Sequence, residues 1–143
     1  VILIIVLAYY GKTTKVQVQA PAPDPETSVL GCYMASLSKD VYTMNITSQN
    51  DKQISGMLSF KNFEKDSSKG TFLGVYNGGL LVADYFFSSE GIDSKMQVIF
   101  RKDGNNFVRG FGPMDKSGEK FADFNNIKFD SKQTFAPSAD CPQ

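Results

Sequence analysis

From Cys32 to Phe135, the hydrophobic pattern has a period of two, the period of a β-strand that buries one face. The alternation is clear at residues 41–47, 53–60 and 95–101. It assigns to one face Tyr42, Met44, Ile46, Ile54, Leu58, Phe60, Met96, Val98 and Phe100. A fourth segment, 80–87, is apolar except at Asp84, which predicts a central strand or one covered on both faces. Since no segment has the period of an amphipathic helix, the pattern indicates an all-β fold.

Turn-forming residues separate the predicted strands, at 48–51, 77–79, 102–106 and 115–118. The strongest hairpin signal is Asn77-Gly78, because both central residues of a type I′ turn adopt positive φ. The spacing predicts about seven to nine short antiparallel strands. Since closing a sheet removes its two unpaired edges, we expect a small antiparallel up-and-down, lipocalin-like barrel of about eight strands. A β-sandwich is the alternative.

The N-terminal residues differ from the rest. Residues 1–10 are apolar and uncharged; as a helix they would be about 15 Å long, too short to span a hydrocarbon core of about 30 Å. Their length fits the hydrophobic region of a secretory signal peptide, and the alternatives are a buried strand, a membrane anchor or a segment docked on a partner. Residues 11–30 are polar and then proline-rich, which predicts an extended linker. The barrel domain is expected at 31–143.

The chain has two cysteines, Cys32 and Cys141, near the two ends of the predicted barrel. An even number placed at the ends of a domain predicts one disulfide bond, formed in an oxidising compartment. The alternatives are two buried free thiols, or a lipidated Cys32 following Val29-Leu30-Gly31. The predicted disulfide supports export.

Composition narrows the range of functions. The 143 residues include 15 Lys plus Arg and 15 Asp plus Glu, whereas a nucleic-acid-binding protein needs a basic surface to neutralise phosphates. The chain contains no His, which excludes Ser-His-Asp and Cys-His nucleophiles and His-containing zinc sites. We therefore expect a binding protein rather than an enzyme, with no cofactor, no metal and no nucleic-acid partner.

Several segments of the predicted barrel form a recognisable set: Cys32-Tyr33, Glu64-Lys65-Asp66, Lys69-Gly70-Thr71, the run from Ala83 to Gly91, and Asp140-Cys141. Together they resemble an uncharacterised family of small exported bacterial lipoproteins. The resemblance implies a β-barrel of the bacterial envelope, exported to the periplasm or the outer-membrane surface, with membrane association through its N-terminus. Members usually carry a lipidated Cys after the hydrophobic region, and residues 8–11 of this chain contain none.

A looser likeness runs to the membrane-bound lysozyme inhibitors, which are small lipid-anchored barrels with a disulfide. The comparable segments are Ser88-Ser89-Glu90-Gly91 and Arg101-Lys102-Asp103-Gly104. This likeness implies an alternative function, inhibition of a cell-wall hydrolase, with Ser89, Glu90 and Lys102 on the inhibitory loops. A third hypothesis is a structural subunit of an envelope assembly that docks through residues 1–10.

The candidate binding residues belong to two groups. Turn residues predicted at the barrel rim, for a protein partner or a small ligand, are Glu64, Lys65, Asp66, Ser89, Glu90, Ser94 and Lys102. Their alternative role is that of solvated turns. The second group is Asp84 and Arg109, which are charged residues within apolar segments. Either both point outward, or both point inward and form a polar floor to a ligand cavity.

Overall fold

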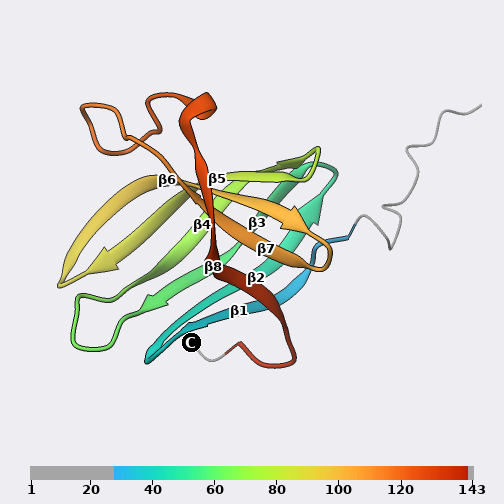
Figure 1. The fold of residues 1–143 in the computed structure, drawn as a ribbon, viewed down its shortest axis with the longest axis horizontal. Helices are drawn as coiled ribbons and strands as arrows, with labels where there is room; N and C mark the ends of the chain where they lie inside the picture. The colour runs from blue at the N-terminus through green and yellow to red at the C-terminus, as the bar shows by residue number, and fades with distance from the viewer. Residues whose placement is uncertain (1–27, 142–143) are drawn as a thin grey trace, which may run out of the picture.

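The computed structural model describes residues 28–141, which form eight β-strands. The strands are β1 (Gly31–Leu37), β2 (Asp40–Asn50), β3 (Gln53–Lys61), β4 (Ser68–Asn77), β5 (Leu80–Ser89), β6 (Ile92–Asp103), β7 (Asn106–Phe111) and β8 (Lys128–Ser138). Each strand pairs antiparallel with the next, and β8 pairs with β1, so the sheet closes into an up-and-down barrel (Figure 1). The predicted all-β barrel is confirmed. The predictions for residues 1–27 lie outside the described residues.

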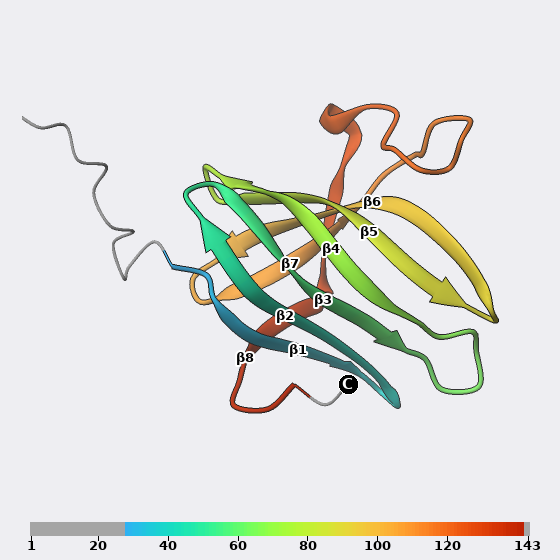
Figure 2. The ribbon, with the colours of Figure 1, turned by 180° about the vertical axis from the view of Figure 1, so that it is seen from behind.

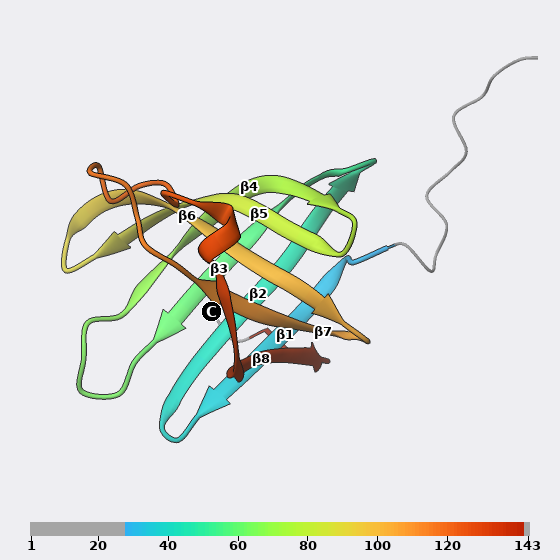
Figure 3. The same cartoon turned by 45° about the horizontal axis from the view of Figure 1, so that its top comes forward.

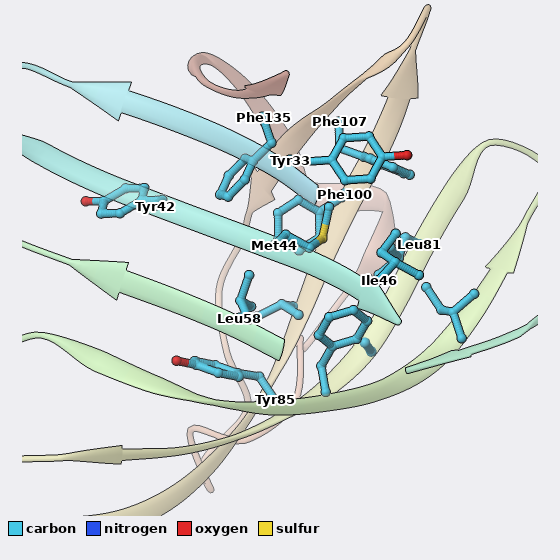
Figure 4. Close-up of a cluster of buried hydrophobic side chains, with 14 of the residues drawn as sticks. Tyr33, Tyr42, Met44, Ile46, Leu58, Leu81, Tyr85, Phe100, Phe107 and Phe135 are labelled. Carbon is cyan, nitrogen blue, oxygen red and sulfur yellow. The ribbon is translucent and has the colours of Figure 1, made fainter. Parts of the chain in front are cut away.

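The alternation of the sequence defines the barrel interior. The predicted face of β2 (Tyr42, Met44, Ile46) is buried, and so are its counterparts on β3 and β6, with Met96 partly buried against them. Inward-facing aromatic and aliphatic side chains from all parts of the barrel meet in one core (Figure 4). The interior is therefore packed with side chains, as in other small barrels.

Two inward-facing glycines allow the strands to approach closely. A Cβ at Gly56 would collide with the carbonyl oxygen of Asn45 on β2, and a Cβ at Gly70 would collide with that of Phe86 on β5. Glycine at such positions lets a strand bend as the barrel curves. These positions therefore support closure of the sheet.

The connections alternate between the two ends of the barrel (Figure 1, Figure 2). Short turns lie at one end, at 51–52, 78–79 and 104–105, together with Ser28–Leu30; we call this the hairpin end. The 62–67 and 112–127 connections lie at the other end with the turns at 38–39 and 90–91; we call this the loop end. The 112–127 connection includes a 3₁₀ helix, η2 (Phe124–Asn126), and runs beside β6, where Gln97 N donates to Glu119 O at 2.7 Å (Figure 3).

The predicted hairpin between β4 and β5 is present, but its central residues differ from the prediction by one position. Asn77 pairs with Leu80, and the φ angles of Gly78 and Gly79 are 60° and 80°. Asn77 thus remains in the ladder, and the two glycines supply the positive φ angles that the turn requires.

The barrel closes where β1 meets β8, over the pairs Cys32–Ser138, Tyr33–Pro137 and Met34–Ala136. Next to this seam, Cys32 and Cys141 form a disulfide across a sequence separation of 109, with their Cα atoms 5.6 Å apart. The predicted disulfide is confirmed.

Val29 was expected in the linker but is only 2% exposed and belongs to the core. It fills the hairpin end, where its backbone N–H donates to Gln49 Oε1.

Strand β5 has an inner face of Leu81, Ala83 and Tyr85. On its outer face, Leu80 and Phe86 are 39% and 45% exposed, so a strand covered on both faces was the wrong alternative for the part of the chain described. Within residues 28–141 there is also no helix with the length and apolarity needed to cross a membrane.

Candidate functional site

The inward-facing residues nearest the loop end form a mixed polar and aromatic group. Tyr42 of β2, Phe60 of β3, Tyr85 of β5 and Arg109 of β7 belong to it, and we call it the loop-end cluster. The Phe60 ring centroid lies 5.0 Å from that of Tyr42 and 5.7 Å from that of Tyr85. Figure 4 shows the hydroxyl groups of Tyr42 and Tyr85 on the same side of the core and that of Tyr33 on the opposite side. The alternation of each strand therefore brings these side chains to one end of the barrel.

The two tyrosines of the cluster bind the 62–67 connection and its exit. Tyr42 Oη donates to Asn62 Oδ1 at 2.7 Å, and Asn62 Nδ2 donates to the Asp66 carbonyl at 2.7 Å. Tyr85 Oη and Ser68 Oγ lie 3.0 Å apart. These bonds fold the connection against the barrel and hold both phenol groups in place.

Arg109 is the charged member of the loop-end cluster. Its guanidinium carbon lies 4.3 Å from the ring centroid of Phe60 and 4.7 Å from that of Phe111. One nitrogen donates to Gln133 Oε1 at 3.5 Å, the long limit of a hydrogen bond. Among residues 28–141, the ion pair present is Lys95–Glu119 on the outside of the barrel. The Arg109 cation is thus stacked on aromatic rings and faces no carboxylate of the described chain.

Burial changes the ionisation of the cluster. It lowers the pKa of Arg109 to about 10, an effect that Tyr42 and Tyr85 partly oppose. Burial raises the pKa of Tyr42 and of Tyr85; Arg109 opposes both shifts, and the bond with Ser68 opposes that of Tyr85. At neutral pH the cluster therefore holds one cation and two neutral phenols.

Asp84 and Arg109 do not face each other. Asp84 alternates with the buried Ala83 and Tyr85, so it points to the outer surface, whereas Arg109 points inward with Phe107. Neither expected arrangement holds, because the two side chains lie on opposite sides of the barrel wall.

Several predicted rim residues lie at the loop end. Glu64, Lys65 and Asp66 are exposed in the 62–67 connection. Ser89 Oγ donates to the Ser67 carbonyl at 2.9 Å, which ties the end of β5 to that connection. Glu90 forms the next turn with a φ angle of 53°.

Lys102 does not join them. Its Nζ donates to the Gly104 carbonyl at 2.7 Å and lies 5.3 Å from the ring centroid of Phe107, at the hairpin end. Burial lowers the pKa of Lys102. Ser89 and Glu90 therefore lie at the loop end and Lys102 at the hairpin end, with the length of β6 between them. Their inhibitory role stays a prediction.

A second candidate site is a hollow of about 580 Å³ on the outside of β4, β5 and β6. Ser94, a predicted site residue, lines it together with Lys69, Phe86, Ser88 and Lys95. Lys95 Nζ lies 3.8 Å from a carboxylate oxygen of Glu119, which borders the same hollow. The lining carries two lysines, Lys69 and Lys95, and two carboxylates, Asp93 and Glu119, so its charges balance in number.

The sequence prediction missed the partners of Arg109. Phe60 was assigned to an inner face, but Gln133 and Phe111 were not singled out. A usable signal was present for Phe111, because it shares the parity of Phe107 and Arg109 along β7. No such signal marks Gln133, which reaches Arg109 through a shift in the β7–β8 register between Val108 and Gly110.

Comparison with protein-family models, curated protein sequences and solved structures finds no match to this chain. Within the described part of the chain, no group of three or more His, Cys, Asp or Glu side chains is placed to hold a metal ion. The geometry of the loop end therefore carries the functional argument.

Proposed function

We propose that the protein is an exported, non-enzymatic binding protein of the bacterial envelope that takes its ligand or partner at the loop end of the barrel. The observation that carries the proposal is the difference between the two ends. The hairpin end is closed by short turns and Val29, whereas the loop end presents long connections around Arg109, whose hydrogen bond to Gln133 is 3.5 Å long.

The hairpin end is sealed by Val29. Tyr33 Oη donates to the Val29 carbonyl at 2.9 Å, and Val29 N donates to Gln49 Oε1 at 2.9 Å. The Tyr33 ring packs edge-on against Phe107 at a centroid distance of 5.0 Å. A ligand would have to displace buried groups to enter there.

The loop end carries the exposed segments on which binding residues usually lie. Its 62–67 connection exposes Glu64, Lys65 and Asp66, and the next turn exposes Glu90. The Phe63 ring is 47% exposed and lies 4.4 Å from Lys39 Nζ. A rim of charged and aromatic side chains around a partly buried cation suits recognition of a ligand or partner.

Three observations support export and the absence of catalysis. The Cys32–Cys141 disulfide suits an oxidising compartment. Residues 1–10 have the length and apolarity of a signal-peptide core. The whole chain lacks His, the side chain that most often serves as a general base.

The hydrolase-inhibitor alternative is less well supported, because Lys102 lies at the hairpin end. We expect the purified protein to leave lysozyme activity unchanged at micromolar concentration. Inhibition that is lost in Glu90→Ala would instead favour that alternative.

Export is tested by trapping thiols in living bacteria that produce the full chain. We expect Cys32 and Cys141 to resist alkylation until a reductant is added, while a Cys141→Ala variant is labelled at once. Rapid labelling of both cysteines in the unreduced protein would place it in a reducing compartment and contradict the proposal.

The binding end is tested with a photoreactive amino acid at one of two exposed positions. Position 90 lies at the loop end, and position 105 lies in a turn at the hairpin end. We expect adducts in the producing cell from position 90 and none from position 105. Adducts from position 105 alone would reverse the assignment of the ends.

A further inference from the structure

We propose that Arg109 is the anchor for the carboxylate of a small organic acid with a flat apolar body. This inference rests on the proposed function and names the chemical class of ligand that the loop end takes. It follows from the charge, the free donors and the surroundings of one side chain.

The charge of Arg109 is unmatched within the described chain. A cation withdrawn from water destabilises the fold unless a partner compensates for it. Arg109 has aromatic faces on Phe60 and Phe111 and one long hydrogen bond to Gln133, and the described chain offers it no ion pair. A bound anion would supply the missing compensation.

Arg109 has N–H donors that make no hydrogen bond within the described chain. A guanidinium group has five N–H donors in a planar fork, and Arg109 uses one of them on Gln133. Within residues 28–141, no fully buried side-chain nitrogen or oxygen lacks a hydrogen-bond partner. The remaining guanidinium nitrogens of Arg109 therefore retain some solvent exposure, in keeping with the intermediate burial of the residue.

The aromatic rings around Arg109 restrict the shape of the ligand that can bind there. The rings of Phe60 and Phe111 lie near the guanidinium and restrict its orientation, so its fork is preorganised for the two oxygens of a carboxylate. The Phe111 ring is 38% exposed and offers an apolar surface at the same point. Deeper in the barrel, Phe100 and Phe135 are completely buried and pack together. A short, flat acid fits these constraints, whereas a long alkyl chain finds no space in the packed core.

The charge count favours a carboxylate over a phosphate dianion. The other charged group that acts on the cluster is Asp40, which affects Tyr42 and is an acid rather than a second base. One buried cation matches one negative charge.

The chain supplies a matched control. It has two arginines, Arg101 and Arg109. The Arg101 guanidinium also lies over an aromatic ring, 4.6 Å from the centroid of Phe129, but on the exposed outer surface. The two residues differ mainly in whether they point out of or into the barrel.

The test is arginine side-chain NMR on the full chain, which contains two Nε–Hε groups to follow. Benzoate, benzamide and inorganic phosphate are titrated separately. We expect benzoate to shift the Arg109 signal in a saturable way and to leave the Arg101 signal in place, while the uncharged benzamide shifts neither.

Arg109→Lys should weaken benzoate binding about ten-fold or more, because lysine keeps the positive charge and lacks the planar fork of N–H donors. Arg109→Met should abolish it, and Arg101→Met should leave it unchanged.

Folding of the variants is checked by their thermal midpoints. We expect Arg109→Met to unfold at a higher temperature than the wild type, because it removes an uncompensated cation from a partly buried site. A large decrease in the midpoint would mean that Arg109 serves the fold, and it would overturn the proposal.

Two binding results would also overturn it: equal shifts of both arginine signals by benzoate, or phosphate binding as tight as that of benzoate. Neither result would contradict the proposed function, binding at the loop end. If these titrations fail while adducts still form from position 90 and not from position 105, the ligand class is wrong and binding at the loop end stands.

Discussion

The two ends of the barrel solve the same packing problem in different ways. Each end has tyrosines and phenylalanines from neighbouring strands, with a basic residue above an aromatic ring: Lys102 above Phe107 at one end, Arg109 above Phe60 at the other. At the hairpin end the lysine reaches a backbone carbonyl and the Tyr33 hydroxyl is satisfied by Val29. At the loop end the arginine is drawn inward without an acidic partner in the described chain.

This difference between the two ends suggests that one contributes mainly to stability and the other to ligand binding. A group whose hydrogen bonds are complete within the fold has little left to offer a ligand. An incompletely compensated group destabilises the free protein and can be compensated by what it binds. The loop end is therefore the end where substitutions should change binding more than folding.

The strongest test of this contrast uses two phenylalanines of the same strand. Phe107 is fully buried at the hairpin end, while Phe111 is 38% exposed at the loop end. We expect Phe107→Ala to lower the free energy of unfolding by about 3–5 kcal/mol and Phe111→Ala by about 1 kcal/mol or less. Chemical denaturation of both variants measures the difference. Equal losses would mean that the two ends are equally part of the core.

A second, smaller effect is expected from the tyrosine hydroxyls. Tyr33→Phe leaves the buried Val29 carbonyl without its donor and should lower the free energy of unfolding by about 1–3 kcal/mol. Tyr42→Phe removes a bond to Asn62 in a partly exposed connection and should cost about 0.5–1 kcal/mol. Denaturant titrations at neutral pH compare the two variants, and a larger loss for Tyr42→Phe would reverse the contrast.

A third test uses alkaline pH. Burial raises the pKa of Tyr33, Tyr42 and Tyr85, so the stability linked to these phenols is complete below the ordinary tyrosine value of about 10 and is lost as the pH rises through the raised pKa. Arg109 acts in the opposite sense: its pKa is about 10 in the fold and its ordinary value is 12.5, so its contribution to stability increases across that window.

Arg109→Met should therefore make the alkaline loss of stability steeper. It should also raise the pKa of Tyr42 and Tyr85 further, since Arg109 lowers both, and leave that of Tyr33 unchanged. Tyrosine ¹³Cζ shifts measured against pH follow each phenol. A shift of Tyr33 equal to those of the other two would show that Arg109 acts on the whole fold.

The smallest effect is expected at Asp84. Its side chain points outward on β5, opposite Leu73 and Gln97. We expect Asp84→Asn to change the free energy of unfolding by about 0.5 kcal/mol or less and to leave benzoate binding unchanged. A clear loss of benzoate binding, measured by the same NMR titration, would show that Asp84 contributes to the binding site.

The case of Asp84 and Arg109 shows where sequence reasoning reaches its limit. Alternation identified the inner faces of β2, β3 and β6, because their outer faces are polar. The segments around Asp84 and Arg109 are apolar on both faces. Their pattern therefore does not show which of the two alternating sets of side chains faces the barrel interior. Val108 illustrates the ambiguity: it lies between the inward-facing Phe107 and Arg109 and is nevertheless 3% exposed.

The contacts of the candidate site were beyond prediction for another reason. Closure, strand number and the disulfide follow from local patterns and from the need to cover sheet edges. The contact between Arg109 and Gln133 depends on a register shift between β7 and β8. Register after a long connection is fixed by the packing of the whole barrel.

We expect the short seam between β1 and β8 to make the state of association of this protein depend on redox conditions. Three residue pairs join these strands, and one of them includes Pro137, which has no N–H to donate. Reduction of the neighbouring disulfide leaves this short ladder to keep the sheet closed. An opened seam exposes two strand edges, which are templates for pairing with other copies of the chain. We therefore expect the oxidised protein to stay dispersed and the reduced protein to self-associate.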